Sequence, residues 1–384
     1  MKHYVFIPIV ELEFWLLFSI AKNLKELYPE RKQTLIFLSH KRLQNRFKNE
    51  KKHFDEVIEF EWFQPSIRHG LKTIILSYKF SILLSKKFNR NTSFICCGFQ
   101  QFIHHHILKH LSSKQLSYVN IQLYPSEKKT VSKTLNWRFT IINSIFFFIR
   151  FQLFSKYYNL KKSEIISNIS YAYLFKKWTI PEHTILNINH DFHPYQNCSY
   201  IDNVPNPYIY LNFQATKKNN LNPNSILILL ADDIAQETPN YYVKVSFLID
   251  YIHHNFSNIT IYLKFHPQIQ DNFEAITTKD YQPLDKTISA EHLFMANPNK
   301  INAVLGSYST ALAISTDFGI STYDCSKFFE IANQDILETY KNKHYINKPI
   351  IYINTQDDLS KITPSTSNKL NLNKTNLLDS LSKL

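Results

Sequence analysis

Two polar segments, each placed directly after an apolar β-rich run, hold the residues best suited to chemistry in this chain. The first is His266-Pro267, which follows the run 259–265 (ITIYLKF) and has Lys264 beside it. The carboxyl ends of parallel strands face the ligand crevice, and proline cannot extend a strand. We therefore expect His266 to face that crevice, where an imidazole can donate to a phosphate or move a proton. A strand-end histidine with a purely local role is the ordinary alternative.

The second polar segment begins 40 residues further on, after the β-rich run 301–305 (INAVL). Gly306 permits a tight turn, and the hydroxyls of Ser307, Ser309 and Thr310 follow where a helix is expected to start. Hydroxyls beside the N–H groups of a helix start form a ready anion site. An ordinary helix cap would look the same, but polar ends on two successive strands favour a nucleotide-phosphate pocket.

An acidic cluster follows a third apolar run, 225–230 (SILILL). Asp232, Asp233 and Glu237 stand at this strand end and could supply a general base. For any single one of these three residues, a role in capping the next helix or shaping the turn before it is an equally good interpretation. Adjacent aspartates also suit a cation, but no further ligands stand at suitable spacing, so we expect no metal site.

The composition argues against several large classes of enzyme. The chain has 384 residues, 44 Lys+Arg against 31 Asp+Glu for a formal charge of +13, and only 4 glycines. Average usage of glycine is about 7%, and the closest two glycines here, Gly306 and Gly319, are 13 positions apart. The Gly-rich loops of Rossmann dehydrogenases, P-loop NTPases and α/β-hydrolases therefore cannot be present. The 4 cysteines form no C-x-x-C pair, so we expect neither a zinc ribbon nor a disulfide framework.

Strand-like and helix-like segments alternate along most of the chain, which predicts βαβ units with parallel sheets. Strands are expected at 5–10, 34–38, 57–60, 93–97, 118–123, 225–230, 259–265, 301–305 and 350–353. Helices are expected at 11–27, 71–84, 102–111, 241–254, 291–295 and 309–316, with residues 133–178 mostly helical, aromatic and basic. We therefore predict an α/β protein of two Rossmann-like domains facing each other across a cleft.

Prolines and asparagines gather between residues 194 and 223, and we place the domain junction there. The predicted domains are 1–200 and 201–365, followed by a polar tail, 366–384, with one amphipathic turn. A second His-Pro pair, His193-Pro194, falls in the junction next to His190 and is taken as a decoy.

No targeting segment or membrane span is expected from the sequence. Glu11 and Glu13 interrupt the apolar N-terminal run, and the apolar run 141–154 is shorter than the ~18–20 residues that a span needs. We expect a cytoplasmic protein, and the basic runs leave open a peripheral position at the inner face of the cytoplasmic membrane. No nucleic-acid-binding motif accompanies those runs, so no nucleic-acid partner is expected.

The order strand, His-Pro, Glu-x-Leu, strand, Gly-Ser-x-Ser-Thr-Ala-Leu resembles the C-terminal half of the bacterial lipooligosaccharide sialyltransferases (glycosyltransferase family 52), relatives of the capsular polysialyltransferases. The matching stretches are YLKFHP (262–267), AEHLF (290–294) and LGSYSTAL (305–312), and the opening 5–21 resembles the first strand and helix of that family. The resemblance implies a GT-B fold, CMP-sialic acid as donor, inversion at the anomeric carbon, and no cofactor or essential metal.

The resemblance also implies roles for individual residues. His266 would contact the CMP phosphate and assist its departure, and Glu291 would bind the cytidine ribose. Donor phosphate or carboxylate would be held by Ser307, Ser309 and Thr310, with Lys264, Pro267 and Gly306 around them. The acceptor, a cell-surface glycan or glycolipid, would bind to the domain 1–200, and the nucleotide-sugar donor would bind to the domain 201–365. The base that activates the acceptor would be Asp232, Asp233 or Glu237.

The family's acidic-acidic-Gly pattern in the N-terminal half is absent here. The corresponding stretch is 121–127 (IQLYPSE), and Gly98 is preceded by Cys97. Two other functions therefore stay open: a phosphotransferase that uses a CDP-activated polyol for capsule or teichoic-type polymers, and a non-catalytic glycan-binding protein.

Overall fold

The chain folds into two compact units, which are described separately. The computed structural model describes residues 2–39, 47–61, 70–97, 116–123, 183–191, 193, 198–211, 219–230, 238–266, 273–297, 299–331, 338, 341–342, 344–364 and 374–384. Unit 1 comprises Met1–Pro207 with Lys374–Leu384, and unit 2 comprises Tyr208–Asn373. The division thus lies seven residues beyond the expected boundary at 200/201, and the end of the chain belongs to unit 1.

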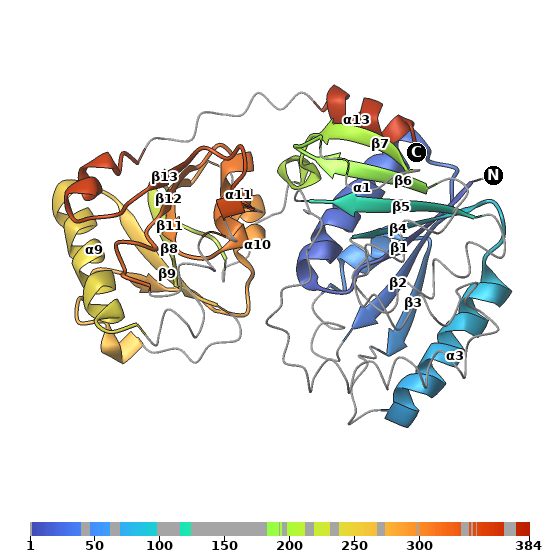
Figure 1. The fold of residues 1–384 in the computed structure, drawn as a ribbon, viewed down its shortest axis with the longest axis horizontal. Helices are drawn as coiled ribbons and strands as arrows, with labels where there is room; N and C mark the ends of the chain where they lie inside the picture. The colour runs from blue at the N-terminus through green and yellow to red at the C-terminus, as the bar shows by residue number, and fades with distance from the viewer. Residues whose placement is uncertain are drawn as a thin grey trace. The chain divides into compact units, whose positions relative to one another are not determined.

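Unit 1 is built on a seven-stranded sheet in which every strand pair is parallel (Figure 1). Its strands are β1 (His3–Ile7), β2 (Gln33–Ser39), β3 (Glu56–Glu61), β4 (Thr92–Cys97), β5 (Ser117–Gln122), β6 (His183–Ile188) and β7 (Ser199–Val204). They are arranged in the order β3-β2-β1-β4-β5-β6-β7. The direction of winding reverses between β1 and β4, and ligands of open α/β sheets bind at such switch points.

Helices cover both faces of the unit 1 sheet. These are α1 (Glu11–Leu27), α3 (Gly70–Lys87) and the C-terminal α13 (Thr375–Ser382), with a short 3-10 helix η1 (Glu50–His53). Helix α1 has the predicted bounds and packs aromatic rings against the sheet, with Phe14 and Phe37 5.6 Å apart between ring centroids. Helix α3 buries Leu76, Phe80 and Leu84, which recur every four residues and so share one face of the helix.

The C-terminal segment corrects the expectation of a polar tail. Helix α13 buries Leu377 and Leu381, which stand four residues apart and so form one apolar face. The helix packs against α1 and β7, and Lys374 pairs with Glu26 of α1. The predicted amphipathic turn is therefore a helix that completes unit 1, and both ends of the chain lie in this unit (Figure 1).

Unit 2 contains a six-stranded sheet, again with parallel pairing throughout. Its strands are β8 (Ser225–Leu230), β9 (Thr260–Phe265), β10 (Gln282–Pro283), β11 (Ile301–Gly306), β12 (Ser321–Asp324) and β13 (Ile350–Tyr352). The order β10-β9-β8-β11-β12-β13 is the Rossmann pattern 3-2-1-4-5-6. The switch point of unit 2 therefore lies between β8 and β11.

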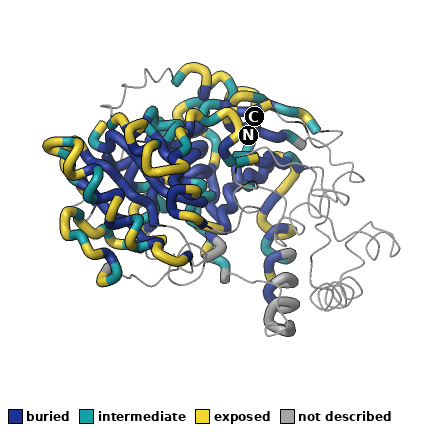
Figure 2. Tube along the Cα trace, turned by 60° about the vertical axis from the view of Figure 1, so that its left-hand side comes forward, coloured by how far each residue is buried: buried dark blue, intermediate teal, exposed yellow. Residues whose placement is uncertain are grey.

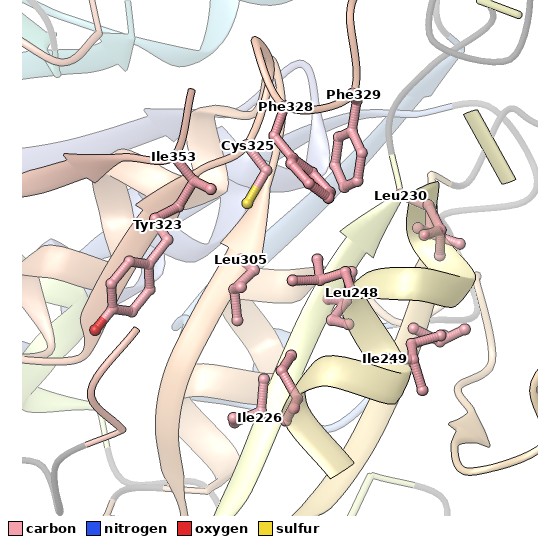
Figure 3. Close-up of a cluster of buried hydrophobic side chains, with 14 of the residues drawn as sticks. Ile226, Leu230, Leu248, Ile249, Leu305, Tyr323, Cys325, Phe328, Phe329 and Ile353 are labelled. Atoms are coloured by element: carbon pink, nitrogen blue, oxygen red, sulfur yellow. The ribbon is translucent and has the colours of Figure 1, made fainter. Parts of the chain in front are cut away.

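The helices of unit 2 also lie on both faces of its sheet. They are α9 (Tyr241–Asn255), α10 (Ala290–Ala296) and α11 (Thr310–Asp317), with 3-10 helices η5 (Phe273–Ala275) and η6 (Asp357–Lys361). A further 3-10 helix, η4 (Pro207–Tyr210), spans the boundary between the two units. On one face, Leu248 and Ile249 of α9 join Ile226 and Leu305 in a buried cluster (Figure 3). In both units, buried residues follow the strands and exposed ones the outer turns (Figure 2).

Four strands were not expected from the sequence: β6, β7, β10 and β12. The expected helix at 102–111 and the helical stretch 133–178 lie outside the described residues. In the part of the chain that the structure describes, no helix has both the length and the apolar character needed to cross a membrane.

Candidate functional site

The turn after β11 is built around Gly306, at the switch point of unit 2. Gly306 is in register with Leu229 of β8 on one side and Asp324 of β12 on the other. A Cβ at this position would lie 2.9 Å from the Leu229 carbonyl oxygen and 3.6 Å from Cδ2 of Leu312 in α11. Only glycine fits without displacing backbone, and it lets α11 begin directly over the end of the strand.

Ser307 is the most distinctive side chain of this turn. It is only 1% exposed, and within the described parts of the chain its Oγ has no hydrogen-bond partner. Leaving a buried polar group unsatisfied costs about 1–3 kcal/mol, so a ligand that accepts a hydrogen bond there would recover that energy. The next residue, Tyr308, has φ +48°, a left-handed conformation that turns the chain into α11.

The other two predicted hydroxyls play different parts. Ser309 is the N-cap of α11, and its side chain accepts a hydrogen bond from the Ala311 N–H at 3.2 Å. Thr310 opens the helix and is partly exposed. The helix-cap interpretation therefore holds for Ser309, whereas Ser307 and Thr310 remain available for the predicted anion site.

The end of β9 carries the predicted histidine. The strand ends at Phe265, and His266 follows it as an exposed residue. Lys264 is 4% exposed, and its Nζ donates to the Phe265 carbonyl at 3.1 Å. Pro267 lies outside the described residues.

The structure brings His266 and Ser307 to the same edge of one sheet. Strands β9 and β11 are the two neighbours of β8, and Phe265 and Leu230 are in register. Adjacent strands are ~4.8 Å apart, so the two strand ends stand about 10 Å from each other. That spacing suits the phosphate and sugar of one nucleotide. We call this edge, formed by the ends of β8, β9, β11 and β12, the unit 2 edge.

Of the four acidic residues predicted for the site, the structure describes only Glu291. Glu291 lies in the first turn of α10, is 9% exposed, and sits on a helix that packs beside α11. Strand β8 ends at Leu230 between β9 and β11, but Asp232, Asp233 and Glu237 fall outside the described residues, so their role as a base stays a prediction.

One carboxylate at the unit 2 edge was missed by the sequence analysis. Asp324 ends β12 and is 3% exposed, and its Oδ1 accepts from the Ser326 N–H at 2.9 Å. Burial raises its pKa, and hydrogen bonds from Ser326 and the charge of Lys341 offset part of that effect. The rule that found His266, a polar residue ending a β-rich run, would also have found Asp324 had the four-residue strand been recognised.

His193, the described residue of the second His-Pro pair, lies inside unit 1 between two strands of its sheet, which corrects its expected place in a domain junction. His193 lies between β6 and β7, with Nε2 2.8 Å from Oδ2 of Asp202 and its ring stacked on Tyr200. Asp202 also accepts from Nδ2 of Asn187 at 2.7 Å, and buried His190 has Nε2 3.2 Å from the Gln122 carbonyl. These contacts tie β5, β6 and β7 together, which is a structural role.

Among the described residues, no group of three His, Cys, Asp or Glu side chains could hold a metal ion. Because the acidic segment 231–237 lies outside those residues, the expectation of metal-independent chemistry stays a prediction.

Comparisons with known proteins identify the fold. No protein-family model matches the chain, and no curated protein matches it either. Among solved structures, a UDP-GlcNAc 2-epimerase from Methanocaldococcus jannaschii is 10% identical over 97% of this chain and 94% of its own, with a TM-score of 0.51. The Neisseria meningitidis UDP-GlcNAc 2-epimerase, solved with UDP-GlcNAc bound, is 10% identical over 100% of both chains, with a TM-score of 0.50.

A putative UDP-N-acetylglucosamine 2-epimerase from Listeria monocytogenes is 8% identical over 99% of this chain and 91% of its own, with a TM-score of 0.50. Likenesses at these identities show the fold alone. Together with the strand orders of the two sheets, they show that the chain has the GT-B fold, built from two Rossmann-like α/β units.

Proposed function

We propose that this protein is a glycosyltransferase that moves sialic acid from CMP-sialic acid to a cell-surface glycan of lipooligosaccharide or capsule, with inversion at the anomeric carbon. The observation that carries the proposal is the buried Ser307 hydroxyl, which lacks a partner in the described chain and lies at the start of α11. The motif that contains it resembles the sialyltransferase motif, and His266 leaves the same sheet edge.

In this proposal the unit 2 edge stabilises the leaving group. Sialyl transfer develops positive charge on the sugar and negative charge on the departing CMP phosphate. Donors fixed in advance around that phosphate lower the barrier, because they need not reorganise during the reaction. The Ser307 hydroxyl and the first N–H groups of α11 would donate to phosphate oxygens, and His266 would donate to the leaving oxygen. Glu291 would bind the ribose.

The first experiment asks which nucleotide the protein binds. A thermal-shift panel of CMP, CDP, UDP and GDP should show stabilisation by CMP, because a ligand that binds only the folded state raises the melting temperature. Stabilisation by UDP but not by CMP would contradict the proposed donor.

The second experiment follows chemistry at His266. CMP release is measured with CMP-sialic acid and, separately, with CDP-glycerol. His266→Ala should lose at least 100-fold in transfer from CMP-sialic acid, whereas the matched variant His254→Ala, an exposed histidine of α9, should keep it. Release from CDP-glycerol alone would favour the polyol phosphotransferase, and glycan binding without CMP release would favour a binding protein.

A further inference from the structure

An open groove lies in unit 1 between helix α3 and β3, the strand at one edge of the sheet (Figure 1). Its volume is about 490 Å³. One wall is formed by Ile58 and Phe60 of β3, which stand two positions apart and so share one face of the sheet. Helix α3 supplies the other wall, which consists of Lys79, Ile82, Leu83, Lys86 and Lys87.

The apolar side chains of the groove are only partly covered. Ile58, Phe60 and Leu83 pack against the buried core of unit 1 and stay half-buried themselves. The ring of Phe60 meets the fully buried ring of Phe80 edge to face, with 5.2 Å between the centroids, so the groove continues the core outward. Removing apolar surface from water is favourable, and the groove therefore favours an occupant with an apolar body.

Two exposed lysines give the same groove a positive charge. Lys79 and Lys86 make no ion pair or hydrogen bond with any residue that the structure describes. They stand seven positions apart, about 10 Å along the helix axis, and the apolar Ile82 and Leu83 lie between them in the sequence. Positions spaced by three, four and seven residues share one side of a helix, so α3 presents charge and apolar surface together.

Two glutamates of the edge strand are already engaged by other lysines. Glu56 pairs with Lys32 at 2.9 Å and also with Lys87 at the end of α3. Glu59 pairs with Lys51 at 2.6 Å. The two exposed lysines of the groove are therefore the cations that an arriving anion can pair with, and pairing with them breaks no ion pair seen in the described chain.

The size and charge of the groove select the class of occupant. Its volume lies within the range of about 300–1,000 Å³ that is usual for small-molecule sites. A protein partner of standard size would instead cover about 800 Å² on each side, far more than seven residues offer. An anionic phospholipid combines an apolar chain with a phosphate, and the formal charge of +13 draws the whole chain toward an anionic bilayer.

We propose that the groove between β3 and α3 binds an anionic phospholipid and attaches the protein to an acidic membrane surface. The headgroup phosphate pairs with Lys79 and Lys86, and an acyl chain lies against the apolar walls. The inference goes beyond the proposed function, because it requires neither a nucleotide nor a transfer reaction. A membrane position would also bring a glycosyltransferase to acceptors that are glycolipids.

The first test measures binding to vesicles of phosphatidylcholine with and without phosphatidylglycerol, by co-sedimentation. The wild type should bind the anionic vesicles at least tenfold more tightly than the neutral ones. The double variant Lys79→Gln/Lys86→Gln should lose at least tenfold of that affinity. The matched double variant Lys279→Gln/Lys383→Gln removes the same charge from two exposed lysines elsewhere and should stay within about twofold of the wild type.

The second test asks whether the acyl chain enters the groove. Soluble dihexanoyl-phosphatidylglycerol, used below its micelle concentration, should raise the melting temperature of the wild type, whereas glycerol phosphate should not. Ile82→Asn should abolish that shift, and the matched variant Val243→Asn, at an exposed position of α9, should keep it.

Three results would overturn the inference. They are equal binding to neutral and anionic vesicles, an equal loss of affinity in both lysine pairs, and a dimer that the groove variants disrupt while no lipid binds. The last result would identify a second copy of the chain as the occupant. A protein that transfers sialic acid in solution but binds neither kind of vesicle overturns this inference alone and leaves the proposed function standing.

Discussion

The environment of Glu13 makes a prediction about stability that needs no substrate. Its carboxyl has a pKa raised from 4.5 to about 7 by burial, so the folded protein holds a proton that the unfolded chain has lost. The stability that this proton contributes is complete below pH 4.5 and disappears as the pH rises through 7. Above pH 7 the folded protein must bury the ionised carboxylate, which costs free energy. Replacing Glu13 with glutamine removes that cost, because an amide stays neutral at every pH and can still accept the hydrogen bonds from the N–H groups of Ile9 and Val10.

The magnitude follows from linkage. For a group that titrates at 4.5 unfolded and about 7 folded, the free energy of unfolding falls by about 2.5 kcal/mol between pH 5 and pH 8. The stability advantage of Glu13→Gln over the wild type should therefore grow by about 2.5 kcal/mol across that range. For a unit of this size, about 1 kcal/mol corresponds to ~2–4 °C, so the difference in melting temperature should widen by about 5–10 °C.

The assay is thermal and urea denaturation of the wild type, Glu13→Gln and Glu11→Gln at half-unit steps from pH 5 to pH 8. Glu11→Gln should differ from the wild type by an amount that hardly depends on pH. A difference between Glu13→Gln and the wild type that stays constant with pH, or that shrinks as the pH rises, would refute the reasoning about the buried carboxyl.

Three further predictions concern the unit 2 edge and the C-terminal helix. Ser307→Ala should keep or slightly raise stability, because it removes an unsatisfied hydroxyl, and it should weaken CMP binding at least tenfold. The control variant Ser315→Ala loses hydroxyl hydrogen bonds to Leu312 and Thr322, so it should instead lower the free energy of unfolding in urea by about 1 kcal/mol. Gly306→Ala should cost about 1–3 kcal/mol in the same assay, since its Cβ would press on backbone 2.9 Å away, and an unchanged midpoint would contradict that. Deleting residues 374–384 uncovers α1 and should lower the melting temperature of unit 1, whereas an unaltered melting curve would show that α13 adds no stability.

The architecture of the repeating units was predictable because its signals are local. The bounds of α1 and β8 agree with the sequence patterns, since α1 has apolar residues at helical spacing and β8 is a continuous apolar run with clear ends. Strands β6 and β7 were missed because prolines and asparagines nearby indicated a junction. Strand β12 was missed because four residues are too few for a pattern.

The placement of candidate residues was predictable only where a polar side chain follows directly after a β-rich run in the sequence. His266 and Ser307 were found in that way, and the structure brings them to one sheet edge. Glu13 was noted only as a charge that interrupts an apolar run, because its special environment comes from Cys96, Cys97 and Tyr118, about one hundred residues away. No local pattern records the burial of a carboxyl by distant strands.

The most direct test of the proposed function is release of CMP from CMP-sialic acid in the presence of a lipooligosaccharide or capsular acceptor, with CDP-glycerol and UDP-GlcNAc as alternative substrates. We predict acceptor-dependent release of CMP from CMP-sialic acid, no reaction with the other two, and loss of the reaction in His266→Ala. Turnover of UDP-GlcNAc or CDP-glycerol, with CMP-sialic acid left intact, would contradict the account.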